Sequence, residues 1–218
     1  MTVKKIISII AISWLLGDCS EGYSEYYEEC YNNNDIDFLY SLLQNNCFDY
    51  DGNNQYTTVE CVFSANEILP DGIIYPVEIC YQEWEDGRLV SLNCQDKELI
   101  GNIPENIGNL NALLYLTMEN NSFQGPIPQS IGNLTSLNTL NLNNNLLSSS
   151  IPLEIGNLSN LEWLIMGDNM LTGEIPEEIG GLSNLLHLYL RNNQLEGEIP
   201  TSIGDLEQLE YLSLMYNN

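Results

Sequence analysis

Basic side chains are nearly absent from this sequence. Its 218 residues include 31 Asp and Glu but only five Lys and Arg and one His, which gives a formal net charge of −26. Nucleic acids and anionic membrane surfaces bind proteins through clusters of basic side chains, so we expect neither as a partner. Apolar residues make up 44% of the chain, which is too many for a disordered acidic tail. The composition therefore predicts a folded and strongly acidic protein.

Long apolar runs are also scarce. An apolar run of eleven residues, Ile6–Leu16, follows two lysines. A membrane-spanning helix needs about 20 such residues, so we expect no membrane insertion in this chain. A basic start, a short apolar run and small residues are typical of a secretory signal peptide, which we place at residues 1–19. Acylation of Cys19, as in a bacterial lipoprotein, is disfavoured because the residue before it is Asp18, so a secreted or cell-surface protein is predicted.

Cysteine is absent from the last 124 residues, and all six cysteines lie within the first 94. Because there is no Cys-x-x-Cys spacing and only one His, we expect no zinc site. In an oxidising compartment this cluster indicates a disulfide framework, with one cysteine left over if the first is removed with the signal peptide. We favour Cys47–Cys61 and Cys80–Cys94, because each pair closes a loop of the same short length, and Cys30 is a further candidate.

From residue 87 onward the sequence repeats itself every 24 residues. Each repeat contains leucines that alternate with other residues, an Asn, an Ile-Pro pair and then Ile-Gly-x-Leu. The Ile-Pro pairs begin at Ile103, Ile127, Ile151, Ile175 and Ile199. The repeated asparagines are Asn121, Asn145, Asn169, Asn193 and Asn217. Self-similarity at a fixed period predicts a solenoid in which each coil packs on its neighbours.

The repeat, LxxLxLxxNxLxGxIPxxIGxL, resembles the plant-type leucine-rich repeat over about residues 80–218. Its alternation places Leu140 and Leu142 on one face of a strand and Asn141 on the other. Coils stacked about 4.8 Å apart would then form a curved parallel sheet on the concave side, over a continuous leucine core. We therefore predict an α/β, β-rich leucine-rich-repeat solenoid, with five full repeats and one partial repeat in residues 87–218.

Two further features of the repeat have a physical purpose. The repeated Asn can use both amide donors and its carbonyl oxygen inside each turn, which would pair backbone groups that are otherwise buried. A glycine follows four residues later in most repeats and suits a tight bend. Ser149 replaces that glycine in one repeat, so we expect a local distortion there. Lys97 replaces the Asn and Cys94 a leucine in the first repeat, as expected where the array joins a cap.

Residues 20–86 carry no repeat and are expected to form a cysteine-containing cap over the first coil, whose apolar end would otherwise be exposed. We expect a short helix that Asn34 caps and that runs through Gln44. The segment Cys80–Trp84 resembles the Cys- and Trp-bearing cap that precedes plant-type repeats. The expected helix places four apolar residues on one face: Ile36, Leu39, Tyr40 and Leu43.

The opposite end of the array has no cap in this sequence. The chain stops at Asn218, one residue past the last repeated Asn, and leaves the edge of a parallel sheet open. We therefore expect either that the sequence is part of a longer array or that a partner covers this end.

One acidic stretch in the cap has the spacing of a calcium-binding loop. Oxygen-bearing side chains stand first, third, fifth and twelfth in the segment from Asp49 to Glu60. However, Asn54 occupies the position where such a loop needs glycine, and Cys47 and Cys61 bracket the segment. We therefore expect a disulfide-closed hairpin and no metal or cofactor.

The predicted outward face of the concave sheet contains the candidate binding residues. Trp163, His187 and Tyr211 fall in one column on adjacent strands, and exposed aromatic residues beside an Arg are typical of protein interfaces. The alternative is that this column only stabilises the sheet. The full set of candidates is Tyr115, Thr117, Glu119, Asn141, Trp163, Ile165, His187, Tyr189, Arg191, Tyr211 and Met215.

The resemblance implies recognition of another macromolecule. Ectodomains of receptor-like kinases and polygalacturonase-inhibitor-like proteins share this repeat type, which implies ligand sensing or enzyme inhibition. We predict a module that binds a protein, peptide or glycan through the concave face. The alternatives are a structural or adhesive surface protein and an inhibitor of a secreted hydrolase. An enzyme is not expected, because no Ser or Cys can be placed with an acidic residue beside the single His.

Overall fold

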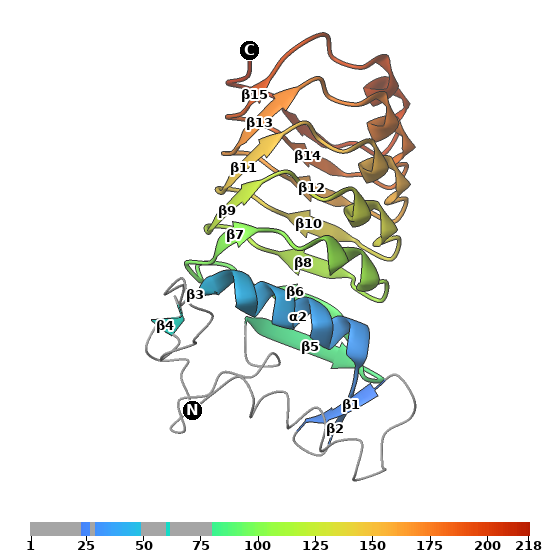
Figure 1. Cartoon of the computed structure of the whole chain (residues 1–218). Helices are drawn as coiled ribbons and strands as arrows, with labels where there is room; N and C mark the ends of the chain where they lie inside the picture. Colours follow the sequence, from blue (N-terminus) through green and yellow to red (C-terminus); the bar gives the residue numbers. More distant parts are fainter. Residues whose placement is uncertain (1–22, 27–28, 49–59, 62–79) are drawn as a thin grey trace.

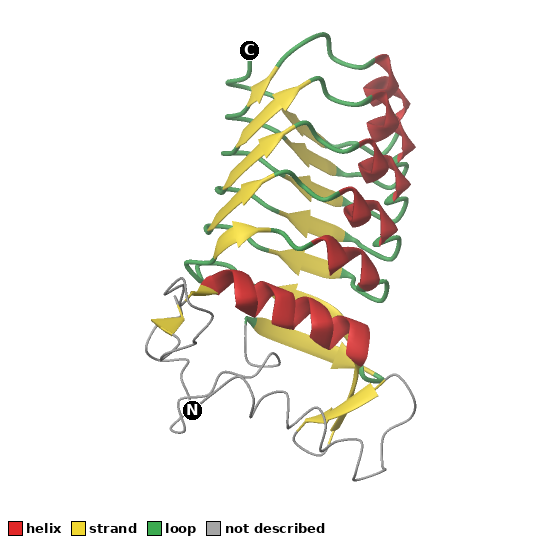
Figure 2. Cartoon of the chain, in the orientation of Figure 1, coloured by secondary structure: helices red, strands yellow, loops and turns green. Residues whose placement is uncertain are grey.

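The computed structural model describes residues 23–26, 29–48, 60–61 and 80–218. The repeats form a solenoid whose coils stack on one another from the helix α2 to the C terminus (Figure 1). Each complete coil contains a strand of one sheet, a strand of a second sheet and a short 3-10 helix (Figure 2). The predicted fold is confirmed.

The first sheet has the pairing that the 24-residue period predicts. Leu140 lies opposite Leu116 on one side and Leu164 on the other, and all three side chains are buried. Six parallel strands are joined at one edge by the antiparallel strand β5 (Tyr81–Glu85). The parallel strands are β6 (Arg88–Asn93), β8 (Tyr115–Thr117), β10 (Thr139–Asn141), β12 (Trp163–Ile165), β14 (His187–Tyr189) and β16 (Tyr211–Ser213).

A second parallel sheet, which the sequence did not predict, runs beside the first. Its strands pair residues 22 positions apart, as in Ile100 with Ser122 and Ser148 with Met170. Each strand is thus shifted by two residues relative to the repeat. The strands are β7 (Ile100–Asn102), β9 (Ser122–Gly125), β11 (Leu146–Ser149), β13 (Met170–Gly173) and β15 (Gln194–Leu195).

The distortion expected at Ser149 is absent. Ser149 has a φ of 70°, close to the 73° and 75° of the equivalent Gly125 and Gly173. Strand β11 keeps the same pairing offset with β13 as the other strands do with their neighbours. The backbone of Ser149 therefore adopts the left-handed conformation that the coil requires.

The 3-10 helices form a row of their own along the solenoid (Figure 2). Each follows the proline of an Ile-Pro pair, because proline fixes φ near the value needed to begin a turn. In the first of them the N–H of Leu110 donates to the carbonyl oxygen of Ile107, which is fully buried. These helices are η2 (Glu105–Asn109), η3 (Gln129–Asn133), η4 (Leu153–Asn157), η5 (Glu177–Gly181) and η6 (Thr201–Asp205).

The repeated asparagines form the ladder that the sequence predicts. Asn145 donates through Nδ2 to the carbonyl oxygens of Met118 and Leu142, at 2.9 and 3.2 Å, and its Oδ1 accepts from the N–H of Phe123 at 3.0 Å. Asn193 makes equivalent bonds two coils away. An unpaired buried backbone group costs about 1–3 kcal/mol. Because each Asn pairs backbone groups of its own coil and of the preceding coil, it stabilises both.

The helix of the cap begins two residues before the predicted start. The helix α2 spans Asn33–Asn46, and the Oδ1 of Asn32 accepts from the N–H of Asn34 at 3.0 Å. Asn32, rather than Asn34, is therefore the capping residue. Phe38 and Leu42 are also fully buried, although the predicted face did not include them. Of that face, Ile36 and Leu39 are buried, Tyr40 packs against the core, and the side chain of Leu43 lies outside the described residues.

An ion pair and backbone contacts fasten the cap to the first coil. Asp35 in α2 is fully buried and accepts hydrogen bonds from the Nε of Arg88 at 2.9 Å and from the N–H of Leu89 at 2.8 Å. The helix also contacts η2 and β7. A hairpin of β1 (Tyr23–Tyr26) and β2 (Glu29–Asn32) precedes α2.

The cysteines agree with one predicted disulfide and leave the others open. Cys80 and Cys94 are bonded, which confirms that pair and links the start of β5 to the end of β6. Strands β3 (Cys47–Phe48) and β4 (Glu60–Cys61) pair with Cys47 opposite Cys61, although their side chains are not described. The Cys47–Cys61 bond and any bond of Cys30 stay predictions. Residues 1–19, which are predicted to form a signal peptide, and residues 49–59 lie outside the described residues.

Candidate functional site

The structure places all eleven predicted residues on the first sheet or in the turns that follow its strands. Tyr115, Arg191, Tyr211 and Met215 are exposed, and the other seven are half-buried. Between them the strand leucines point inward and are buried, from Leu92 in β6 to Leu188 in β14. The alternation therefore separates core from surface as predicted.

Four of these residues form one aromatic cluster. The rings of Trp163 and His187 stack with centroids 3.6 Å apart and an angle of 18° between their planes. Tyr189 and Tyr211 stack at 5.6 Å, and each lies 6.1 Å from His187. The aromatic cluster thus comprises Trp163, His187, Tyr189 and Tyr211, on three neighbouring strands. Trp163, His187 and Tyr211 meet because the sheet pairs residues 24 apart.

The aromatic cluster is partly open to solvent and partly packed. Tyr211 is 57% exposed, whereas Trp163, His187 and Tyr189 are half-buried. Within the part of the chain that the structure describes, the buried Nδ1 of His187 has no hydrogen-bond partner. Tyr115 occupies the same column two strands from Trp163 but lies outside the cluster, because Thr139 stands between them.

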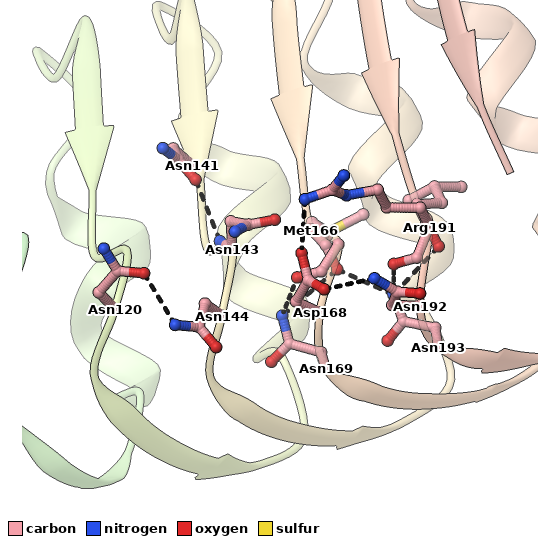
Figure 3. A network of polar contacts seen from close by, with 12 residues as sticks. Asn120, Asn141, Asn143, Asn144, Met166, Asp168, Asn169, Arg191, Asn192 and Asn193 are labelled. Atoms are coloured by element: carbon pink, nitrogen blue, oxygen red, sulfur yellow. Dashed lines mark hydrogen bonds and ion pairs between the residues drawn. The ribbon is translucent and has the colours of Figure 1, made fainter. Parts of the chain in front are cut away.

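The predicted Arg191 is held by Asp168, a charged residue that was not among the candidates. Arg191 reaches back over Gly167 to Asp168, with 3.2 Å between its Nη2 and the carboxylate. A Cβ at Gly167 would stand 2.9 Å from the Oδ1 of Asn143 and 3.1 Å from the Cγ of Arg191, so a larger residue would crowd both side chains. Figure 3 shows Asp168 joined to both Arg191 and Asn192. Asp168 and Asn192 are 24 residues apart, and this spacing could have indicated the contact between these two residues.

The N-terminal part of the same face is polar. The Nδ2 of Asn141 donates to the carboxylate of Glu119 at 2.9 Å. The Oδ1 of Asn141 accepts from the N–H of Asn143 at 3.0 Å (Figure 3). The predicted residues therefore divide into an aromatic region and an amide-rich region. Tyr115, Thr117, Ile165 and Met215 belong to neither network.

An open groove runs along the edge where these strands begin. Asn160 and Asn184 donate to the carbonyl oxygens of Thr135 and Ser159, each at 2.8 Å, and so hold one wall in place. Glu162 is the one charged residue among those that line it. We call this the edge groove; its lining residues are Leu114, Tyr115, Ser136, Asn138, Asn160, Glu162 and Asn184.

The described residues contain no cluster of three His, Cys, Asp or Glu side chains that could hold a metal ion. Among the same residues, no helix has the length and apolar character needed to cross a bilayer.

The outward face of the first sheet presents aromatic rings, amide groups and carboxylates. These groups suit non-covalent recognition.

The comparisons with known proteins agree with this architecture. Residues 159–218 match a family model described as leucine rich repeat, and residues 112–134 and 136–158 match a second model with that description. The ectodomain of the plant receptor kinase GASSHO1/SCHENGEN3 from Arabidopsis thaliana is 46% identical over 59% of this chain, with a TM-score of 0.59. The chain is a plant-type leucine-rich-repeat protein. No curated protein sequence matches it.

Two further structures show how differently this fold is used. The ectodomain of the Arabidopsis receptor kinase HAESA, solved with a peptide hormone ligand, is 28% identical over 85% of this chain, with a TM-score of 0.66. A plant ice-binding protein is also 28% identical, over 86% of this chain and 57% of its own, with a TM-score of 0.64. This leucine-rich-repeat protein spans only 16% of the GASSHO1/SCHENGEN3 chain and 29% of the HAESA chain.

Proposed function

We propose that this leucine-rich-repeat protein is an extracellular recognition module that binds a peptide segment on its concave sheet. The aromatic cluster is the observation that carries this proposal. Rigid aromatic side chains beside an arginine provide large contact area at low entropic cost, and such residues dominate binding energy at protein interfaces.

The relatives support a peptide ligand in particular. The HAESA ectodomain was solved with a peptide hormone, and the GASSHO1/SCHENGEN3 ectodomain was solved in complex with CASPARIAN STRIP INTEGRITY FACTOR 2. The six parallel strands of the first sheet extend for roughly 24 Å at the usual strand spacing, which is enough for a segment of about seven extended residues.

Selection from a random dodecapeptide library on the full chain tests the proposal. Peptides enriched on the unmodified chain should bind Trp163→Ala and Tyr189→Ala about thirtyfold more weakly, because truncating a central aromatic residue at an interface costs about 2 kcal/mol. Binding is measured by calorimetry, and folding stability by urea denaturation of the same variants.

Leu153→Ala is the matched control, because Leu153 is a large apolar residue that is exposed in the η4 helix. It should leave peptide binding unchanged. If Trp163→Ala and Tyr189→Ala lowered stability but left binding intact, the aromatic cluster would only stabilise the sheet. A structural or adhesive role would then be the better explanation.

A further inference from the structure

The groups that flank the aromatic cluster point to the charge of the segment that binds there. Glu162 immediately precedes Trp163 and lines the edge groove together with Leu114 and Tyr115. The backbone carbonyl of Glu162 accepts from the N–H groups of Leu186 and His187, at 2.9 and 3.0 Å. Its backbone is therefore fixed, and its side chain supplies the charge of a groove that is otherwise lined by Leu114, Tyr115 and neutral polar residues.

The nearby positive charge is already paired. Arg191 bonds Asp168, whose carboxylate also accepts from Asn192. Glu210 occupies the same column as Glu162, two strands farther along, and is exposed. An anionic segment would therefore meet two carboxylates on a chain whose net charge is −26.

We propose that the edge groove holds a lysine or arginine side chain of the bound segment. Its aliphatic stem would pack on Leu114 and Tyr115 while its charged end pairs with the carboxylate of Glu162. Neighbouring cations of the segment would lie against the faces of the aromatic cluster. This inference rests on the proposed function and specifies the chemical class of the ligand, a cationic peptide.

Electrostatics favours the same ligand at long range. A strongly negative surface raises the association rate of cationic partners, and this effect weakens as salt screens the charges. Binding should therefore weaken markedly between 50 and 300 mM NaCl. A neutral peptide held only by aromatic contacts would show little salt dependence.

The test uses the dodecapeptide library on the full chain. Peptides whose enrichment depends on Trp163 should have a positive mean net charge, and replacing their Lys and Arg by Gln should weaken binding about tenfold. Neutral or acidic peptides that depend on Trp163 would overturn this inference and leave the proposed function standing. A selection without any Trp163-dependent peptide would overturn both.

Two variants with the same change in net charge test whether peptide binding depends on Glu162 itself or on the overall charge of the chain. Glu162→Gln should weaken binding of the enriched peptides about fivefold to tenfold, as expected for a half-buried charge pair. Glu178→Gln removes one negative charge from the exposed surface of η5 and should change binding less than about twofold. Equal effects of the two substitutions would overturn the groove assignment, because only the overall charge would then matter.

Discussion

At the scale of single residues, the array depends on a few backbone positions that most side chains avoid. Ser149 has a φ of 70° where the equivalent positions in the other repeats hold glycine. A non-glycine residue in this region costs about 1–2 kcal/mol, because its Cβ approaches the carbonyl oxygen. We expect Ser149→Gly to raise the free energy of unfolding by about 1 kcal/mol, measured by urea denaturation.

The neighbouring serine provides the control for this prediction. Ser148 lies in the same strand, β11, and is not among the residues with positive φ. Glycine at this position relieves no backbone strain in the folded state and increases the flexibility of the unfolded chain. Ser148→Gly should therefore lower the free energy of unfolding by about 0.5–1 kcal/mol. Stability changes of the same sign in both variants would contradict the explanation from φ.

At the scale of elements, neighbouring 3-10 helices pack so closely that a methyl group cannot fit between them. A Cβ added at Gly108 in η2 would stand 2.6 Å from the carbonyl oxygen of Ser130 in η3. We expect Gly108→Ala to lower the free energy of unfolding by about 1–3 kcal/mol, because the coils must separate to accept it. Chemical denaturation followed by circular dichroism measures the change.

The last 3-10 helix offers the same substitution without a neighbour. A Cβ at Gly204 in η6 would meet nothing within 4 Å. Gly204→Ala should therefore be neutral or slightly stabilising. A comparable loss at Gly204 would show that the intrinsic conformation of the glycine, rather than packing between coils, sets the cost.

At the scale of the whole molecule, stability depends on sealing the first coil with the cap. Asp35 is fully buried in that junction and holds both Arg88 and the N–H of Leu89. We expect Asp35→Asn to lower the free energy of unfolding by about 3 kcal/mol, because a neutral amide would replace the buried carboxylate that pairs with Arg88. Urea denaturation at pH 7 measures this loss.

Asp37 provides the control, since it lies in the same helix and is exposed. Partial desolvation raises the pKa of the Asp37 carboxyl above its ordinary value. A carboxyl whose pKa is higher in the folded state stabilises the fold at low pH and loses that contribution as pH rises through the folded pKa. Asp37→Asn should therefore not destabilise the protein at pH 7, and an equal loss in both variants would contradict the role given to Asp35.

The sequence predicts those contacts of the candidate site that join equivalent positions of neighbouring repeats. Trp163, His187 and Tyr211 share a repeat position, so their sequence spacing alone predicts that their rings stack. Asp168 and Arg191 occupy different positions in the repeat, and their contact depends on the space left by Gly167. Contacts between different repeat positions depend on side-chain reach, which periodicity does not describe.

The amino-acid sequence by itself determined the solenoid, the register of the first sheet, the asparagine ladder and the outward face. Each of these repeats every 24 residues, and a fixed period translates directly into neighbouring positions in stacked coils. Only the tertiary structure decided the second sheet with its 22-residue offset, the ion pair between the buried Asp35 and Arg88, and the edge groove beside Glu162. These features depend on how the coil bends and where the cap docks, and both are set by packing between groups that no repeat relates.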